Sequence, residues 1–231
     1  MENALINRLF ALRDEKYRAF QLPLIPGMDA DRVIGVRTPE LKRIAKELKK
    51  DGQADGFLAS LPHRYFEENQ LHAFILSLEK DFDKALSGTD LFLSYVDNWA
   101  TCDQTSPAVF AKNAERLLPY IEKWLASGET YRTRFALLCL MRYFLDGRFK
   151  PEYLDKVASL PPGEYYVDMV RAWYFATALA KQYESTLPVL KERRLDVFTH
   201  NKTIRKACES FRVPDERKNE LKKLVLKSID K

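Results

Sequence analysis

The residues Val96-Asp97-Asn98-Trp99-Ala100-Thr101-Cys102-Asp103 place an indole ring and a carboxylate four positions apart. In a helix, side chains at positions i and i+4 project from the same face. A flat ring beside a carboxylate could hold a sugar ring and stabilise a positive charge developing on it. The same spacing also fits a Trp99 in the core and an Asp103 that caps the next helix.

Segments with a helical spacing of apolar residues fill the chain between proline and glycine breaks. No segment alternates convincingly with the period of two that strands show. Thr38-Pro39-Glu40 is typical of a helix start, with Thr38 as the cap and Pro39 as the first helical residue. The predicted class is therefore all-α. The predicted helices cover residues 3–20, 39–50, 55–61, 64–79, 82–95, 107–118, 119–126, 130–146, 151–160, 164–183, 187–194, 202–211 and 215–229.

Three arginines begin apolar stretches at similar intervals. Arg134, Arg171 and Arg205 are separated by 37 and 34 residues. This period is typical of stacked helical hairpins, which curve so that the equivalent helix of each repeat lines the inner side. We expect the three arginines to line one groove, although an Arg at the shoulder of a helix can also extend into solvent.

Composition indicates an intracellular globular protein without a metal site. The chain has 231 residues, of which 46% are hydrophobic and 31% charged. Its three cysteines, Cys102, Cys139 and Cys208, are far apart and form no CxxC pair, which argues against disulfides and zinc. The longest apolar run, Phe135 to Met141, is too short to span a membrane, and the charged N-terminal residues do not form a signal peptide.

Charge is distributed unevenly along the chain. Residues 1–115 carry a net charge of −3, and residues 116–231 carry +8, which together give the total of +5. A basic half predicts a surface that binds a polyanion. Surface lysines that only keep the protein in solution are the alternative.

Two other chemically active side chains have simpler explanations. His72 lies on an apolar helix face, so a core or rim position is favoured over catalysis. Cys102 adjoins the Trp/Asp segment but has no His partner in the sequence, and we interpret it as a packing residue. No Gly-rich phosphate loop and no nucleophile elbow occurs.

Several segments together resemble the AlkD-type DNA alkylation repair glycosylases, a family built of HEAT-like helical repeats, and the likeness runs over nearly the whole chain. Asn98, however, stands where the family has an aromatic residue before the Trp. The segments that carry the resemblance are Gly35-Val36-Arg37-Thr38-Pro39-Glu40, Asn98 to Asp103, Tyr131-Arg132-Thr133-Arg134 with Phe135 to Tyr143, Arg171-Ala172-Trp173, and Asn201 to Ala207.

The resemblance implies a single domain over residues 1–231: an α-solenoid of HEAT-like hairpin repeats with a concave basic groove for double-stranded DNA. It implies removal of cationic N3- and N7-alkylated purines without flipping of the base. It implies no cofactor, no metal and no membrane partner. We expect a monomer in the cytoplasm, associated with the nucleoid through DNA.

The resemblance also implies roles for individual residues. Asp103 would stabilise the cationic sugar and orient water, Trp99 and Trp173 would pack on the deoxyribose, and Arg134 would hold a phosphate or Asp103 itself. A shift of one residue would exchange Trp173 for Tyr174, and Arg142 competes with Arg134 for its role. The implied DNA-binding residues are Arg37, Thr38, Arg171, Lys202, Arg205 and Lys206.

Two other hypotheses stay open. A catalytically inactive helical-repeat module could bind nucleic acid, and a helical array could instead bind proteins. Salt distinguishes these two, because binding through phosphates weakens steeply with ionic strength.

Overall fold

The computed structural model describes residues 2–227, with side chains from residue 4 onward, and these residues form helices and turns without any strand. The all-α class is confirmed. The helices are α1 (Glu2–Ala11), α2 (Glu15–Gln21), η1 (Leu22–Leu24), η2 (Ala30–Arg32), α3 (Thr38–Lys50), α4 (Ala54–Ala59), α5 (Phe66–Ser77), α6 (Phe82–Phe92), η3 (Leu93–Tyr95), α7 (Trp99–Gln104), α8 (Ala108–Lys112), α9 (Ala114–Leu125), α10 (Thr130–Tyr143), α11 (Glu152–Ala158), α12 (Tyr165–Lys181), α13 (Tyr183–Lys191), α14 (Val197–Glu209) and α15 (Asp215–Lys222).

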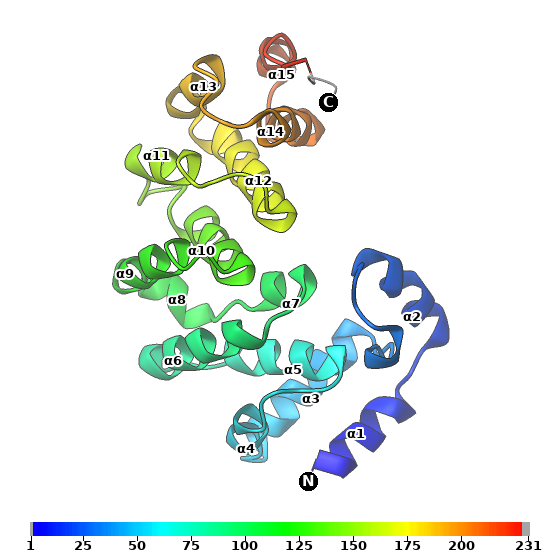
Figure 1. Cartoon of the computed structure of the whole chain (residues 1–231). Helices are drawn as coiled ribbons and strands as arrows, with labels where there is room; N and C mark the ends of the chain where they lie inside the picture. Colours follow the sequence, from blue (N-terminus) through cyan, green and yellow to red (C-terminus); the bar gives the residue numbers. More distant parts are fainter. Residues whose placement is uncertain (1, 228–231) are drawn as a thin grey trace. The chain divides into compact units, whose positions relative to one another are not determined.

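The chain forms two compact units, Met1–Leu117 and Leu118–Lys231, with the boundary inside α9. In the N-terminal unit, α5 is the central helix and packs against α3, α4, α6 and α7 (Figure 1). Because neighbours surround α5, even its polar residues 67–70 are buried. A helix buried on all sides needs polar partners for such residues, and these partners organise the site described below.

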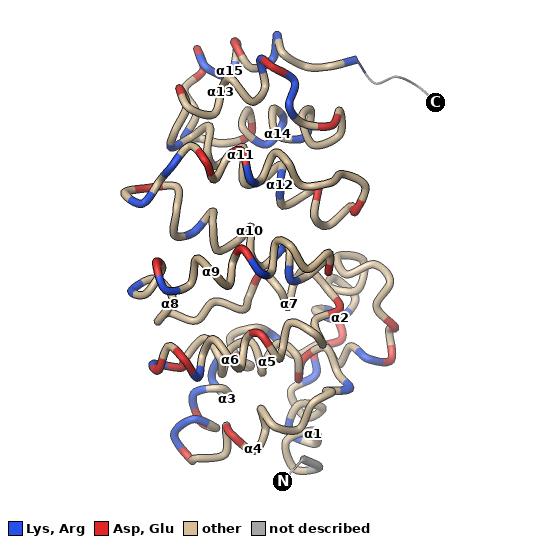
Figure 2. The backbone as a smooth tube through the Cα atoms, turned by 60° about the vertical axis from the view of Figure 1, so that its left-hand side comes forward, with Lys and Arg blue, Asp and Glu red and all other residues tan. Residues whose placement is uncertain are grey.

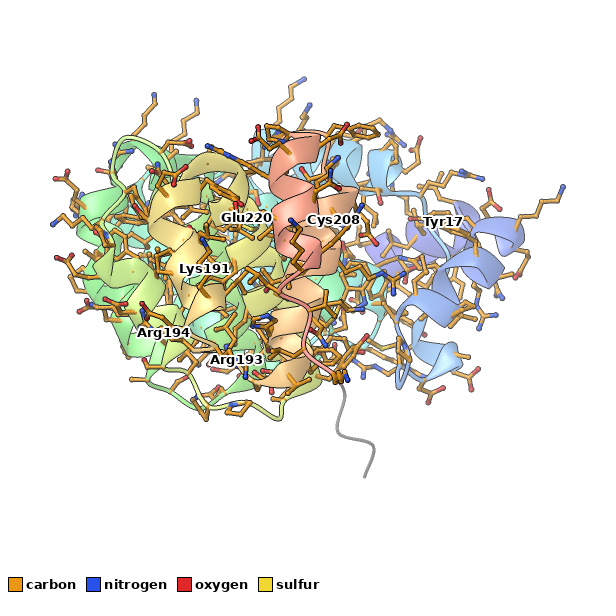
Figure 3. The ribbon with its side chains drawn as sticks, turned by 90° about the horizontal axis from the view of Figure 1, so that it is seen from above. Tyr17, Lys191, Arg193, Arg194, Cys208 and Glu220 are labelled. Atoms are coloured by element: carbon orange, nitrogen blue, oxygen red, sulfur yellow. The ribbon has the colours of Figure 1, made fainter. Side chains whose placement is uncertain are left out.

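In the C-terminal unit, α12 is the central helix. It packs against α10, α11, α13 and α14, and α15 covers α14 (Figure 1). Most residues of α10 and α12 are buried, as their nearly continuous apolar sequences predict. Outside this core, Lys191 of α13 pairs with Glu220 of α15 at 2.9 Å, and both are marked in Figure 3.

Several helix limits differ from the sequence-based prediction. Residues 3–20 form two helices instead of one, because Asp14 caps α2 by accepting a hydrogen bond from the Tyr17 N–H. α9 continues through Pro119, where we predicted a new helix to begin. Pro119 removes one backbone donor, but Ile121 and Trp124 are fully buried in the same helix and offset that loss.

Towards the C-terminus, the predicted helix 187–194 is instead Tyr183–Lys191 with Pro188 inside it. α14 begins five residues earlier than predicted because Asp196 caps it through the Thr199 N–H. α15 ends at Lys222. The predicted end of this helix, residues 228 and 229, lies outside the described part of the chain.

Candidate functional site

The segment with the candidate Trp/Asp pair is a short helix fixed from its inner side. Asn98 caps α7 by accepting a hydrogen bond from the Thr101 N–H at 2.8 Å. The Thr101 hydroxyl is buried and accepts a 2.9 Å hydrogen bond from the Gln70 side chain of α5. Cys102 is also fully buried, as the packing interpretation predicts. The inner residues thereby set the orientation of the opposite face.

Trp99 and Asp103 occupy that opposite face. Both are half-buried, and because α7 is helical over this range they lie one turn apart on the same side. Asp103 does not cap the next helix, since the N-cap of α8 is Pro107. The simpler interpretation of Asp103 as a capping residue is therefore wrong.

The Trp99 ring is held in a defined orientation. It packs against a small cluster that includes Ile25, Val33 and Phe66. Its indole N–H donates a 2.7 Å hydrogen bond to the carbonyl oxygen of Leu24, which lies 75 residues earlier in the chain. A ring fixed at both its edge and its N–H can present a preorganised surface to a ligand.

The loop before α3 wraps around a buried carboxylate. The Glu67 side chain of α5 accepts hydrogen bonds from the backbone N–H groups of Ile34, Gly35 and Val36 at 2.9, 2.6 and 3.3 Å. Burial raises the pKa of the Glu67 carboxyl, and the three N–H donors act in the opposite direction. Gly35 has φ +96°, and a Cβ there would lie 2.6 Å from the Cβ of Arg18. Only glycine fits this loop.

This loop presents Arg37 and Thr38. Arg37 is exposed, forms an ion pair with Asp14 at 2.8 Å and lies 5.2 Å from the centre of the Tyr17 ring. The Thr38 hydroxyl is 3.4 Å from the Tyr17 hydroxyl. Thr38 is the first residue of α3 and Arg37 is its N-cap, so the predicted Thr38 cap is wrong by one residue.

Arg134 is largely enclosed in the C-terminal unit. It is 6% exposed, and its Nη1 donates a 2.8 Å hydrogen bond to the carbonyl oxygen of Tyr166 in α12. Arg142 is half-buried in the last turn of α10. Of the two arginines, Arg142 is thus the more exposed.

Trp173 is an exposed aromatic residue in the middle of α12. It is 41% exposed, whereas Tyr174 is fully buried. Trp173 lines a cavity of about 280 Å³ together with Lys206 and Arg212. The sequence does not decide between Trp173 and Tyr174, and of the two only Trp173 is exposed.

Arg171 is an interior residue, which corrects the prediction that it lines a groove and contacts DNA. It is 1% exposed, and its Nη1 donates to Asp168 at 2.9 Å and to Asp196 at 3.2 Å. Its Nη2 donates to the carbonyl oxygen of Ala158. A buried guanidinium needs such anionic partners, and they tie α11, α12 and the start of α14 together. We remove Arg171 from the DNA-binding candidates.

The three basic candidates of α14 differ in their surroundings. Lys202 and Lys206 lie one turn apart, with the Lys202 Nζ 5.9 Å from the Phe198 ring centre and Lys206 in the cavity with Trp173. Arg205 is exposed and pairs with Glu209 at 3.0 Å. Figure 2 marks the basic and acidic positions of this helix in blue and red. Arg134, Arg171 and Arg205 therefore do not share one environment, contrary to the prediction from their spacing.

Sequence reasoning missed the residues that position α7 and the loop before α3. The Gln70 side chain of α5 holds α7, and the Glu67 side chain of α5 holds the loop before α3. The backbone carbonyl of Leu24 holds the Trp99 ring. A signal for the first two was present, because residues 67–70 are four consecutive polar residues in a helix whose other residues, apart from His72 and Ser77, are apolar. No signal in the sequence indicates which carbonyl oxygen would accept from Trp99.

The sequence matches the family described as DNA alkylation repair enzyme over residues 6–158, which is more than half of the chain. The protein therefore belongs to the DNA alkylation repair enzyme family. No individual curated protein matches it. The matched range includes Trp99, Asp103 and Arg134, whereas Trp173 and the basic residues of α14 lie beyond it.

Among residues 2–227, no helix is both long and apolar enough to cross a membrane. Within residues 2–227, no group of three or more His, Cys, Asp and Glu side chains is arranged to hold a metal ion.

Proposed function

We propose that this protein is a monofunctional DNA glycosylase that hydrolyses the N-glycosidic bond of cationic N3- and N7-alkylated purines in duplex DNA, the first step of base excision repair. The observation that carries the proposal is the α7 helix of a DNA alkylation repair family member, which holds Trp99 and a half-buried Asp103 on one face. In this proposal the helices form HEAT-like repeats of one domain over residues 1–231, with a basic surface for DNA.

The chemistry requires one carboxylate. An N-alkylated purine is already positively charged, so it leaves as a neutral base and needs no general acid. The sugar becomes cationic as the bond stretches, and a nearby carboxylate stabilises that charge and orients the attacking water. We assign both tasks to Asp103, and this reaction calls for neither a metal nor a cofactor.

The remaining residues bind and orient the DNA. Trp99 packs on the deoxyribose, and its fixed indole suits that role. Trp173 supplies a second aromatic surface. We assign Arg134, which also donates to the carbonyl oxygen of Tyr166, to a DNA phosphate. The proposed DNA-binding residues are Arg37, Thr38, Lys202, Arg205 and Lys206.

Recognition without base flipping completes the proposal. Glycosylases usually extrude the target base into a pocket, at the expense of stacking and pairing. A cationic base is recognisable by its weakened glycosidic bond, so a surface that stabilises the sugar suffices. We expect the protein to act as a monomer on DNA in the cytoplasm.

Release of 7-methylguanine from methylated duplex DNA tests the proposal. We expect the wild-type protein to release the base and Asp103→Asn to be slower by roughly 10²–10³-fold, the usual effect of removing one charge-stabilising group. Asp97→Asn is the matched control, because Asp97 lies in the same segment but pairs with Arg32 at 2.9 Å, and we expect nearly wild-type release.

Absence of base release by the wild-type protein would refute the glycosylase proposal. If that protein still binds duplex DNA, with an affinity that falls steeply as salt rises, the inactive nucleic-acid-binding module takes its place. An affinity for duplex DNA that does not change with salt concentration would instead favour a protein as the natural partner.

A further inference from the structure

The helices α12 and α14 pack side by side in the C-terminal unit (Figure 1), and a cavity of about 280 Å³ opens between their C-terminal halves. Ala176 and Ala180 line it on the α12 side, and their small side chains leave the space open. Trp173 forms one wall and is 41% exposed. The cavity is therefore accessible from the surface and has an aromatic ring in its lining.

Two cationic side chains line this cavity from α14 and from the turn that follows it. Lys206 is half-buried and Arg212 is exposed, and neither forms an ion pair with another described residue. The acidic residue of the lining, Glu209, pairs with Arg205 at 3.0 Å, so its charge is compensated. The cavity thus keeps an excess of positive charge, which favours an anionic ligand.

The turn that carries Arg212 has a defined conformation. The buried Val213 fixes its end, and the Val213 N–H donates to the carbonyl oxygen of Ser210 at 3.4 Å. The Arg212 N–H donates to the Ser210 hydroxyl oxygen at 3.2 Å, so the O–H of Ser210 remains a donor for a ligand in the cavity. A guanidinium, an ammonium and a hydroxyl meet here, and these groups bind phosphate oxygens in protein–DNA contacts.

An indole ring beside phosphate-binding groups fits one unit of the DNA backbone. Each phosphate of DNA is joined covalently to a deoxyribose, so a site that holds both needs a flat apolar surface next to cations. An inorganic anion would use the cations but not the ring. The lining of the cavity therefore matches a sugar with its phosphate better than it matches a free anion.

We propose that this cavity holds the backbone phosphate joined to the deoxyribose that packs on Trp173. Arg212 and Lys206 neutralise the phosphate, and the Ser210 hydroxyl donates to it. The inference rests on the proposed function, which assigns Trp173 to a deoxyribose, and it adds Arg212 and Ser210 to the DNA-binding residues. A phosphate contact fixes the register of the strand and reads no base, so it suits recognition without base flipping. Arg212 is a positioning residue in this scheme and does not touch the reacting atoms.

Replacement of single phosphates by uncharged methylphosphonates tests this contact. The probe is a duplex with one tetrahydrofuran abasic-site analogue, which fixes the register and cannot be cleaved. Neutralisation of the bound phosphate should weaken binding of the wild-type protein roughly tenfold, as expected for the loss of hydrogen bonds to a charged group. Arg212→Gln should weaken binding of the unmodified duplex by a similar factor. In that variant the same methylphosphonate should cost little more, because both changes remove one contact.

Salt dependence and kinetics provide further readouts that a merely structural role would not move. Arg212→Gln should reduce the slope of log affinity against log salt by about 1, whereas Arg212→Lys should retain the slope because it keeps the charge. In base release, Arg212→Gln should raise KM and leave kcat nearly unchanged.

Arg193→Gln is the matched control, because Arg193 is an exposed arginine of the same unit that does not line the cavity (Figure 3). It removes the same charge, yet every methylphosphonate penalty should stay at the wild-type level. Thermal unfolding of each variant checks that the fold is retained.

The possible failures are distinguishable. Equal methylphosphonate penalties in the wild-type protein and in Arg212→Gln at every position refute the phosphate site, and if 7-methylguanine is still released, the phosphate site alone falls. If one penalty disappears in Arg212→Gln but the wild-type protein releases no 7-methylguanine, the phosphate site stands and the glycosylase proposal falls.

Discussion

Substitution of Arg171 by Met tests the interior role of that side chain. The guanidinium is 1% exposed and lies 2.9 Å from Asp168 and 3.2 Å from Asp196. Met fills much of the same volume but carries no charge. Removal of one partner of a buried ion pair costs about 3–5 kcal/mol, because the remaining charge, here that of Asp168, stays buried. Each carboxylate keeps one backbone donor, from Gly163 and Thr199, so we expect the lower end, about 3 kcal/mol.

Urea unfolding, followed by circular dichroism, measures this loss. With a slope of about 1–3 kcal/mol per molar urea, the midpoint should fall by roughly 1–3 M. Adding Asp168→Asn to Arg171→Met should recover part of the stability, because it removes one uncompensated charge. Arg205→Met is the exposed control, with an expected change below about 0.5 kcal/mol. Unchanged stability together with a loss of DNA affinity would refute the interior role and restore Arg171 as a DNA contact.

Two further predictions concern the N-terminal unit. Burial lowers the pKa of His63 to about 4 and that of His72 to about 3, so below pH 6.5 the unfolded chain binds protons that the fold excludes. Stability should be complete above pH 6.5 and fall as the pH drops towards 4, by about 1.4 kcal/mol per pH unit for each histidine. Urea unfolding at pH 7.5 and 5 should show this loss, with a shallower dependence in His72→Leu, and equal free energies at both pH values would contradict it. Gly35→Ala should destabilise by about 1–3 kcal/mol, because φ is +96° and the new Cβ would lie 2.6 Å from the Cβ of Arg18. Gly52→Ala, with φ +69° and no atom within 4 Å, should cost less when both variants are unfolded in urea, and the reverse order would count against the steric explanation.

Much of the helical pattern could be predicted because local rules and tertiary packing agree. The helical spacing of the apolar residues in the predicted helix 39–50 puts them on one face, and in α3 these residues are all buried, namely Leu41, Ile44, Ala45 and Leu48. The predicted helix limits are wrong where tertiary packing overrides the local rules. Pro119 predicted the start of a new helix, yet it lies inside α9, and the helix predicted from residue 187 begins at Tyr183. Burial of the neighbouring apolar side chains outweighs one missing backbone hydrogen bond, and a sequence does not show how deep that burial is.

The candidate site was only partly predictable for a similar reason. The α-helix required to put Trp99 and Asp103 on one face is present, since Asn98 is a good N-cap by its local chemistry. The regular spacing of arginines misled, because periodicity gives a position along a repeat but not the side chain's surroundings. Arg171 meets two carboxylates in the interior, whereas Arg205 lies exposed beside one.

Residue types alone are enough to establish the all-helical class, the membership of a DNA alkylation repair family and the one-turn spacing of Trp99 and Asp103. These depend on residue types at short separations, where backbone preferences act directly. Helix packing is needed to show that Leu24 holds the Trp99 indole, that Glu67 shapes the loop before α3, and that Arg171 is internal. Each of these depends on a hydrogen bond or ion pair between residues distant in the chain or in different helices, and such contacts are fixed only when the helices have packed.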